Sequence, residues 1–274
     1  MKIDSHVHFW NYNKERDVWM KDMKLLQMDY LPVDLDHVLH DNGIQGCIAV
    51  QAEQSESETE FLVSLADKYP IIKGVVGWID LQRPDLEERL LFFSERKIIK
   101  GWRHIVQGEP VGFMEGNSFR NGISLLQQFG FTYDILIFDH QLKDALNIIE
   151  QFPTQKFVID HCAKPGVASG NIAEWKSMVH QLAKFPRVYC KLSGLMTEAN
   201  WNAWDKNDFY PYFDVIFEVF GTNRIMYGSD WPVMLVSGAY EQWRDLVEGY
   251  MSDFSYDEKN AVMGGNTSGF YGLD

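Results

Sequence analysis

The sequence predicts a (β/α)8 barrel, in which eight parallel strands alternate with helices. Eight short runs are rich in β-branched and aromatic residues, longer amphipathic stretches separate them, and 274 residues are enough for such a barrel. The main alternative is a doubly wound open sheet, but no Gly-x-Gly-x-x-Gly follows the first run to support a dinucleotide site. No repeat, low-complexity tract or Ser/Gly-rich linker divides the chain, so we expect one domain over residues 1–274.

The expected strands are short runs that end in polar residues. They lie at 2–8, 46–51, 72–80, 98–105, 132–138, 156–161, 187–193 and 224–230. The expected helices have apolar residues at helical spacing. They lie at 56–69, 84–96, 122–130, 141–152, 172–185, 209–221 and 239–251. The segment 9–45 is long for one connection, and we expect it to cover the mouth of the barrel with Trp10, Tyr12 and Trp19.

Composition limits the partners. A formal net charge of -14 would repel phosphate backbones and anionic membrane surfaces, which makes nucleic acids and lipids poor candidates and favours a small molecule. Cys47, Cys162 and Cys190 are odd in number and lie in apolar runs, as is typical of reduced thiols. With no export signal and no apolar stretch of membrane-helix length, we expect a cytoplasmic protein, and homo-oligomers remain open.

Polar residues gather where the chemistry of such a barrel belongs, at the carboxyl ends of the strands. His6 and His8 end the first strand and point the same way, roughly 6–7 Å apart, because strand side chains alternate. His161 ends the sixth strand and Asp230 the last. Three imidazoles and a carboxylate that meet in space would hold zinc or manganese.

Other strand-end residues are candidates for substrate binding. Arg103 and His104 end an apolar strand, where an inward charge would be costly without a purpose. Lys164 and Lys191 fit a substrate role and equally a structural one, in which they stack on the rim or pair with a carboxylate such as Asp160. Trp231 fits an apolar wall of the site or ordinary packing.

Two further residues are weaker candidates. Glu53 could bind a hydroxyl group or a metal, or could belong to the charged start of a helix, and His140 is a possible extra ligand. His37, His40 and His180 are expected to be plain surface or helix-packing residues.

Six blocks of sequence, in order along the chain, together resemble the amidohydrolase superfamily. They are "DSHVHFW" (4–10), "VQAEQSESETEFL" (50–62), "KGWRHIVQ" (100–107), "IDHCAKP" (159–165), "CKLSGL" (190–195) and "YGSDWP" (227–232). More narrowly, they are similar to its lactonase branch, which holds L-fuconolactonase, L-rhamnonolactonase and 2-pyrone-4,6-dicarboxylate lactonase.

The resemblance implies a distorted barrel that hydrolyses a sugar-derived lactone, with His6, His8, His161 and Asp230 at its centre. Asp230 would be the general base, and His161 with Arg103 or His104 could stabilise the oxyanion. The chain offers Arg103 in place of a strand-end lysine that could bridge two ions, so at most one metal ion is expected. Members of this branch differ in whether they need a metal, so zinc, manganese and metal-independent catalysis all stay open.

Two alternatives remain. Another metal-dependent amidohydrolase or a decarboxylase of the superfamily is one, although a decarboxylase would be expected to carry a histidine where this chain has "CKLSG" (190–194). A non-catalytic carbohydrate-binding barrel is the other, and it would have no need of Asp230 as a base.

Overall fold

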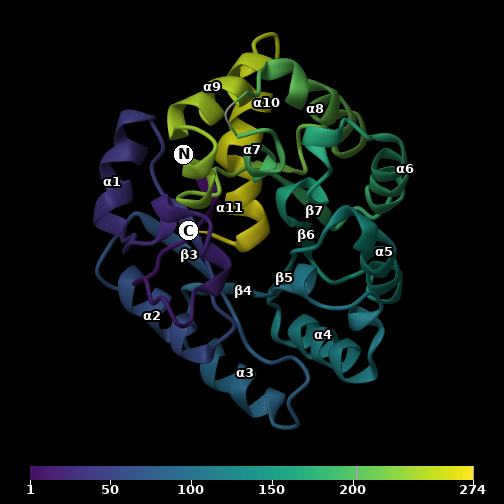
Figure 1. Ribbon diagram of the computed structural model, residues 1–274. Coiled ribbons are helices and arrows are strands. Elements are labelled where there is room, and N and C mark those ends of the chain that lie inside the picture. Colours follow the sequence, from purple (N-terminus) through teal and green to yellow (C-terminus); the bar gives the residue numbers. More distant parts are fainter. Residues whose placement is uncertain (202, 274) are drawn as a thin grey trace.

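Eight parallel strands form a barrel in the computed structural model, which describes residues 1–201 and 203–273. Each strand pairs with the next along the chain, from β1 to β8 (Figure 1). The strands are β1 (Asp4–Val7), β2 (Cys47–Val50), β3 (Ile72–Gly77), β4 (Ile99–His104), β5 (Thr132–Ile135), β6 (Phe157–Ile159), β7 (Val188–Leu192) and β8 (Ile225–Tyr227). The predicted (β/α)8 barrel is confirmed.

The barrel closes just beyond the ends of its first and last strands. The amide of Asp230 donates to the carbonyl of His6 at 2.9 Å, and the amide of His8 donates to the carbonyl of Trp231 at 2.8 Å. The strand registers shift between β1 and β2, between β2 and β3, and between β3 and β4. The barrel is therefore distorted, and its closure places residues 6–8 beside residues 230–231.

Helices surround the strands (Figure 1). They are α1 (Pro32–Asp41), α2 (Glu56–Ala66), α3 (Leu86–Ser94), α4 (Asn117–Phe129), α5 (Leu142–Gln151), α6 (Ala173–Leu182), α7 (Leu195–Glu198), α8 (Lys206–Phe220), α9 (Tyr240–Tyr250), α10 (Tyr256–Asn260) and α11 (Asn266–Tyr271). Of these, α1, α7, α10 and α11 were not among the helices expected from the sequence. The segment 9–45 contains α1 and two short 3-10 turns, Val18–Met20 and Lys24–Leu26.

The C-terminal helix α11 lies across the end of the barrel where the strands begin. Lys100 and Lys156, at the starts of β4 and β6, donate their Nζ hydrogens to the carbonyls of Gly272 and Phe270, both at 3.1 Å. One cluster of buried apolar side chains from α11, the strands and the segment before β1 fills this end, which we call the barrel floor. Its members are Ile3, Ile48, Val50, Val76, Val158, Met226, Phe270 and Tyr271.

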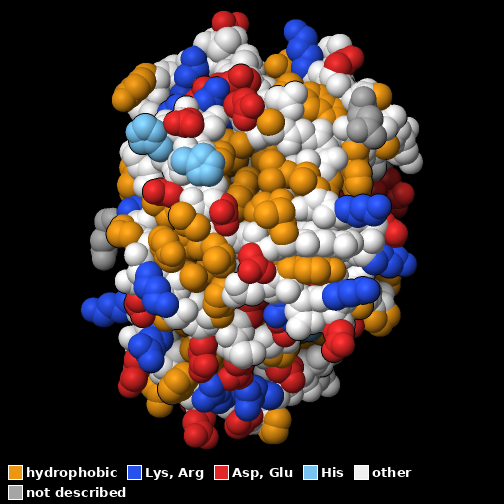
Figure 2. All heavy atoms as spheres, turned by 60° about the vertical axis from the view of Figure 1, so that its left-hand side comes forward, with side chains coloured by type: hydrophobic (Ala, Val, Ile, Leu, Met, Phe, Trp, Pro, Cys, Tyr) orange, Lys and Arg blue, Asp and Glu red, His pale blue; other side chains and the backbone are white. Residues whose placement is uncertain are grey.

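The chain before α1 leaves apolar side chains on the surface. Val18, Trp19, Leu25 and Met28 are all exposed, and so is Val33 in the first turn of α1. Figure 2 looks onto the side that carries α1 and shows apolar side chains gathered there among charged ones. Within residues 1–201 and 203–273, no helix has the length and apolar character needed to cross a membrane.

Candidate active site

The backbone takes rare conformations where the chain leaves β6 and β8. Four consecutive residues after β6, from His161 to Lys164, have positive φ angles between 46° and 60°, and Asp230 after β8 has φ 65°. Left-handed conformations cost roughly 1–2 kcal/mol per non-glycine residue and tend to cluster at functional sites. Here they turn the side chains of His161, Lys164 and Asp230 toward one cavity.

A glycine leaves room for the ring of His161. Gly194 has φ +67°, and a Cβ atom there would lie only 2.4 Å from His161 Nδ1. The neighbouring Ser193 places its hydroxyl oxygen 2.9 Å from the same nitrogen. The "LSG" sequence after β7 thus sets both the position and the hydrogen bonding of His161.

The four residues predicted as the centre come together at the mouth of the barrel. Nε2 of His6 lies 3.1 Å from Nε2 of His8, and Nε2 of His8 lies 3.3 Å from Oδ1 of Asp230. The same carboxylate oxygen is 3.9 Å from Nε2 of both His6 and His161. Residues from the beginning, middle and end of the chain therefore share one buried point.

Hydrogen bonds on the far side of the rings direct lone pairs toward this point. Nδ1 of His8 lies 2.8 Å from the carbonyl oxygen of Val50 and must carry a proton, so the neutral form of the ring presents the lone pair of Nε2 to the centre. Nε2 of His6 accepts a hydrogen bond from Arg103 Nη1 at 3.1 Å. The same nitrogen faces Nε2 of His8. Lone pairs that face one another at such distances are stabilised by a cation between or beside them.

This donor set fits one divalent metal ion. Ligand atoms 2.0–2.1 Å from a tetrahedral zinc would be roughly 3.3 Å apart, close to the separations of 3.1 to 3.9 Å between these nitrogens and Oδ1 of Asp230. Ligand atoms of His6, His161 and Asp230 all lie within 4.8 Å of one another. The guanidinium of Arg103 offers a second source of positive charge at the same place.

Burial sets the protonation of the centre. Burial lowers the pKa of His161 to about 4, although Asp230 and Asp160 oppose this, and it lowers the pKa of His6 well below its ordinary value. For Asp230, burial alone would raise the pKa, but His161 and His8 outweigh it and hold the pKa below its ordinary value. At neutral pH the centre thus has neutral imidazoles at His6 and His161 and an ionised carboxylate.

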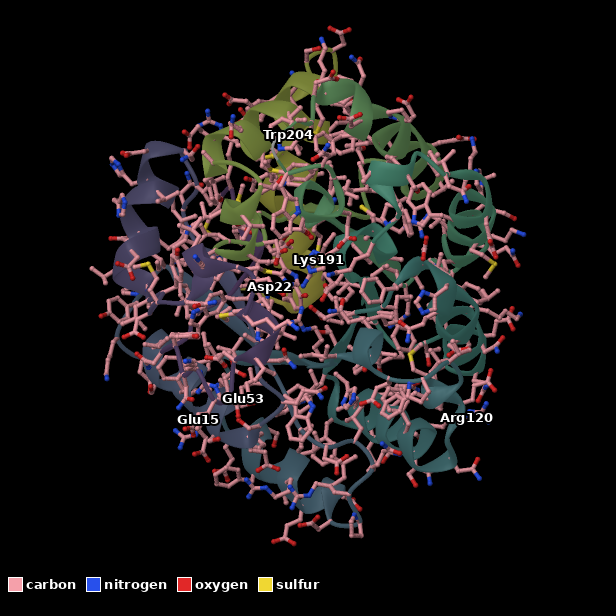
Figure 3. The ribbon with its side chains drawn as sticks, viewed as in Figure 1. Glu15, Asp22, Glu53, Arg120, Lys191 and Trp204 are labelled. Carbon is pink, nitrogen blue, oxygen red and sulfur yellow. The ribbon has the colours of Figure 1, made fainter. Side chains whose placement is uncertain are left out.

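A second group of buried charges lies beneath His6. Arg103 Nη1 donates to Asp160 Oδ2 at 3.0 Å, and Lys191 Nζ lies 3.0 Å from Asp160 Oδ1 and 2.5 Å from Asp134 Oδ2. Lys191 is completely buried, and Figure 3 places it near the axis of the barrel. The geometry thus agrees with the structural alternative for Lys191, a pairing with Asp160.

The cavity above the centre has a volume of about 220 Å³. Polar side chains and apolar side chains share its wall. The polar ones are His8, Arg103, Gln107, His161, Lys164 and Asp230, and the apolar ones are Trp19, Ala52, Ile105, Leu136 and Val233. Ala52, Ile105, Gln107, Leu136 and Val233 were not predicted. Ile105 and Leu136 lie within the expected strands 98–105 and 132–138, which end earlier in the structure, at His104 and Ile135.

His104 lies outside this cavity. Its Nε2 is 2.9 Å from Glu109 Oε1, its Nδ1 accepts the indole N–H of Trp78 at 3.3 Å, and its ring stacks on Phe113. Neighbouring side chains on a strand point to opposite faces, so Arg103 and His104 cannot both face the barrel interior. Arg103 therefore lies at the centre, and His104 lies outside the wall of the cavity.

Two other candidates also lie outside the cavity. Trp231 is buried and packs edge to face against Phe9 and Tyr30, which agrees with the packing alternative. His140 is largely exposed and stacks on Phe138. Lys164, by contrast, lines the cavity and lies 3.5 Å from Glu198 on α7.

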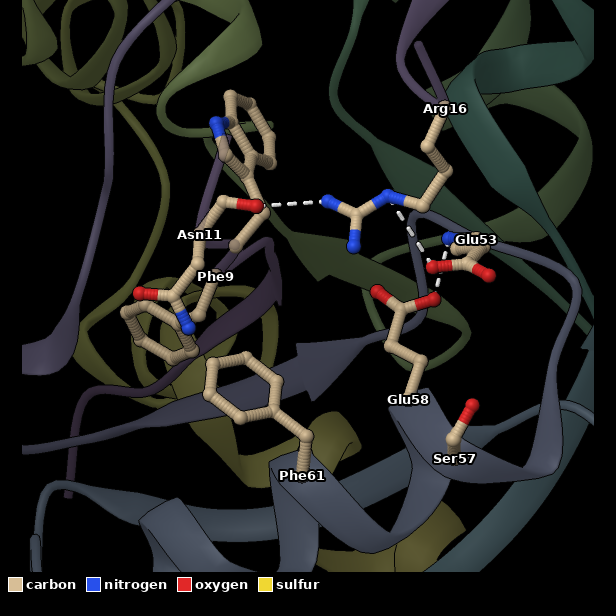
Figure 4. A pocket seen from close by; sticks show the side chains of 8 residues that line it. Phe9, Asn11, Arg16, Glu53, Ser57, Glu58 and Phe61 are labelled. Carbon is tan, nitrogen blue, oxygen red and sulfur yellow. Dashed lines mark hydrogen bonds and ion pairs between the residues drawn. The ribbon is translucent and has the colours of Figure 1, made fainter. Parts of the chain in front are cut away.

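Glu53 lines a neighbouring pocket. Its Oε2 lies 3.2 Å from Arg16 Nε, and the Arg16 guanidinium also donates to the carbonyl of Asn11 (Figure 4). Beside it, the carboxylate of Glu58 accepts the backbone N–H groups of Ala52, at 2.8 Å, and of Glu53. Glu58 therefore fixes the β2–α2 loop, and burial raises its pKa to about 8.

Comparison with known proteins places this fold and site in a family. The sequence model described as amidohydrolase matches residues 3–273. The chain belongs to the amidohydrolase family. The predicted resemblance is confirmed.

Lactonases and other amidohydrolases are among the proteins that are similar to this chain. An L-fucono-1,5-lactonase of Burkholderia multivorans is 37% identical over 286 residues, which cover 100% of this chain and 96% of that protein. An L-rhamnono-gamma-lactonase of Scheffersomyces stipitis matches more distantly, at 26% identity over 187 residues that cover 60% of this chain and 56% of that protein. A crystal structure of an amidohydrolase from Burkholderia multivorans with bound zinc superposes with a TM-score of 0.96 at 36% identity, over 100% of both chains.

Proposed function

We propose that this amidohydrolase is a lactonase that opens the ring of a sugar-derived lactone, such as L-fuconolactone or L-rhamnonolactone. The observation that carries the proposal is the ionised carboxylate of Asp230, which lines the cavity 3.3 Å from Nε2 of His8. The names of the similar proteins, L-fucono-1,5-lactonase and L-rhamnono-gamma-lactonase, support the substrate class.

Asp230 would move the proton in both halves of the reaction. It takes a proton from the water that attacks the lactone carbonyl carbon, so that a new C–O bond forms. As the bond between that carbon and the ring oxygen breaks, Asp230 returns the proton to the leaving oxygen, and the product is an open-chain hydroxy acid. The low pKa of Asp230 keeps the carboxylate ionised and ready to act as the base at neutral pH.

Arg103 is the best placed donor for the oxyanion. It lines the cavity and carries a permanent positive charge at the centre. Well-placed donors of this kind contribute roughly 3–4 kcal/mol to transition-state stabilisation in other enzymes. Lys164 and Gln107, on the same wall, could donate to the hydroxyl groups of the substrate.

His6, His8, His161 and Asp230 would hold a divalent ion if one is required. When bound, such an ion supplies a Lewis acid that polarises the carbonyl or lowers the pKa of water. The zinc in the similar Burkholderia multivorans structure supports this possibility. The residues of this chain would still supply the proton transfer and the contacts with the sugar.

The proposal is tested by acid release. Purified protein is incubated with a panel of aldonolactones and a pH indicator, and the rate of spontaneous opening is subtracted. Wild type should release acid, and Asp230→Asn should lose at least about 100-fold in kcat/KM, because a general base contributes ~10²–10⁴-fold. Asp22→Asn removes an exposed carboxylate and should match wild type.

Other outcomes distinguish the alternatives. Binding of sugar lactones without acid release would indicate a carbohydrate-binding barrel, and carbon dioxide release from hydroxybenzoates would indicate a decarboxylase. Metal dependence is tested separately, by elemental analysis of protein purified without a histidine tag and by rates before and after chelation. A metal-dependent enzyme should lose activity on chelation and regain it with zinc or manganese.

Cellular location and assembly are further parts of the proposal. All three cysteines are free and buried, which supports a reducing compartment such as the cytoplasm. A homo-oligomer remains a prediction, and light scattering after size-exclusion chromatography would measure the molar mass in solution.

A further inference from the structure

A tyrosine near the C-terminus reaches the charges beneath the catalytic centre. The Tyr271 hydroxyl, on α11, donates to Asp134 Oδ2 at 2.7 Å. Lys191 Nζ donates to the same oxygen at 2.5 Å and lies 3.2 Å from His6 Nδ1. All four side chains are buried. The last helix is thus joined to the first strand by three successive polar contacts.

The ring of His6 has competing partners on both nitrogens. Nδ1 lies between the ammonium of Lys191, a donor, and Asp160 Oδ1, an acceptor at 3.4 Å. Nε2 lies between Arg103 Nη1, a donor, and His8 Nε2, whose lone pair can accept. Only when Nδ1 carries the proton and points it at Asp160 does His6 present a lone pair to the centre.

The position of Lys191 decides this competition. An ammonium that moves toward His6 Nδ1 favours the proton on Nε2 and removes the lone pair from the centre. Two carboxylates hold Lys191 at shorter distances than His6 does: Asp134 at 2.5 Å and Asp160 at 3.0 Å, against 3.2 Å for His6. Tyr271 is the second donor on the same carboxylate oxygen and fixes where that oxygen lies.

The hydroxyl of Tyr271 is not needed to fill the barrel floor. The other members of that cluster are entirely apolar, and Phe270 fills space beside Tyr271 without any polar group. A buried hydroxyl stabilises the fold only when it is hydrogen bonded. The partner of this hydroxyl belongs to the charges that contact His6.

We propose that Tyr271 is a positioning residue for the catalytic centre, which acts through Asp134 and Lys191 to hold His6 with its Nε2 lone pair directed at the centre. The catalytic part of this inference rests on the proposed lactonase function. The part that concerns the His6 ring does not.

The kinetic test compares two tyrosine variants. Tyr271→Phe should lower kcat about tenfold, because a small misplacement of a reacting group is costly, and should leave KM within about twofold, because Tyr271 does not line the cavity. Tyr250→Phe is the matched control: its hydroxyl also donates to an aspartate, Asp214, at 2.8 Å, but between α9 and α8. It should keep the wild-type kcat. A purely structural role for Tyr271 would lower Tm and leave kcat of the folded enzyme unchanged, which would overturn the proposal.

The second readout needs no substrate or metal. Nitrogen-15 NMR of the histidine rings reports which nitrogen carries the proton, and a His6→Gln variant identifies the His6 signals. These signals should move in Tyr271→Phe and stay in place in Tyr250→Phe. Asp134→Asn should move them in the same direction. Unchanged His6 signals in Tyr271→Phe would overturn the inference, whereas a wild-type protein that opens no lactone would overturn only the proposed function.

Discussion

The two ends of the barrel differ in the polarity of their buried side chains. At the floor, the strands enclose apolar side chains and the C-terminal helix closes the end. At the mouth, the same strands end in imidazoles, carboxylates and a guanidinium whose lone pairs and charges face one another. Burial of apolar surface stabilises the floor. Burial of polar and charged groups at the mouth is unfavourable unless they are paired.

The difference extends to the backbone. Positive φ angles at non-glycine residues occur after β6 and after β8, in the described chain only at His161 to Lys164 and at Asp230. Such strain persists because the surrounding structure fixes it, and the rigid floor and strands provide that support. Loss of apolar packing at the floor should therefore lower stability, and changes at the mouth should lower activity.

A cavity at the floor should have the largest effect on stability. Ile48 is completely buried in the floor cluster, and Ile48→Ala should lower the free energy of unfolding by about 2–5 kcal/mol. Denaturant unfolding measures this loss. Below the transition, kcat and KM should stay near wild type, because the apolar side chain of Ile48 can make no polar contact with the centre. A selective loss of kcat would mean that apolar packing at the floor, and not the Tyr271 hydroxyl alone, positions the centre.

Gly194→Ala alters the packing at the mouth of the barrel. The new Cβ would lie 2.4 Å from His161 Nδ1, at a φ of +67° that alanine adopts only with strain. The His161 ring must shift, and the expected loss in kcat is about 100-fold. Gly130→Ala, at φ +76° with open space around it, tests the backbone strain alone. Equal losses in both variants would argue against a specific effect on His161.

Trp19→Ala tests the apolar part of the cavity wall. Trp19 is 42% exposed, lines the cavity and packs edge to face on Trp10. Loss of its contact with the sugar should raise KM roughly fivefold, which corresponds to about 1 kcal/mol of apolar contact, with little change in kcat. Val18→Ala, at its exposed neighbour, should leave KM unchanged.

The last prediction concerns pH and the loop between the mouth and helix α2. The pKa of Glu58 is raised by burial from 4.5 to about 8, so the folded state holds a proton that the unfolded state has lost between these pH values. The contribution of Glu58 to stability is fully present below about pH 4.5 and is lost as pH rises through about 8.

Glu58→Gln cannot ionise, so its Tm should fall less than that of wild type between pH 5 and 8. Glu60→Gln, on the exposed side of the same helix, should follow the wild-type curve. Parallel curves for wild type and Glu58→Gln would contradict the assigned pKa shift.

The sequence was informative about strands and about the residues at their ends. Apolar periodicity placed all eight strands, and the spacing of His6 and His8, with His161 and Asp230, identified the groups that meet at the centre. These features follow from local alternation and from the rule that barrel strands carry function at their carboxyl ends.

Long-range packing explains what was missed. His104 ends the same strand as Arg103, but alternation turns it away from the cavity. Helix α11 was not expected, because its short sequence gains its structure from docking against the barrel. Helix α10 was not expected either, and none of its residues is buried. The contact of Tyr271 with Asp134 joins residues 137 positions apart, which no local pattern reveals.

The most direct measurement is a crystal structure of the protein with an aldonate product such as L-fuconate. The account predicts that the product carboxylate lies within about 3.5 Å of Arg103, near hydrogen-bond reach, that Asp230 lies at the hydroxyl formed from the ring oxygen, and that the carbon chain points toward Trp19 and Leu136. An aldonate bound elsewhere, for example between Phe61 and Arg16, would contradict the assignment of this mouth as the catalytic centre.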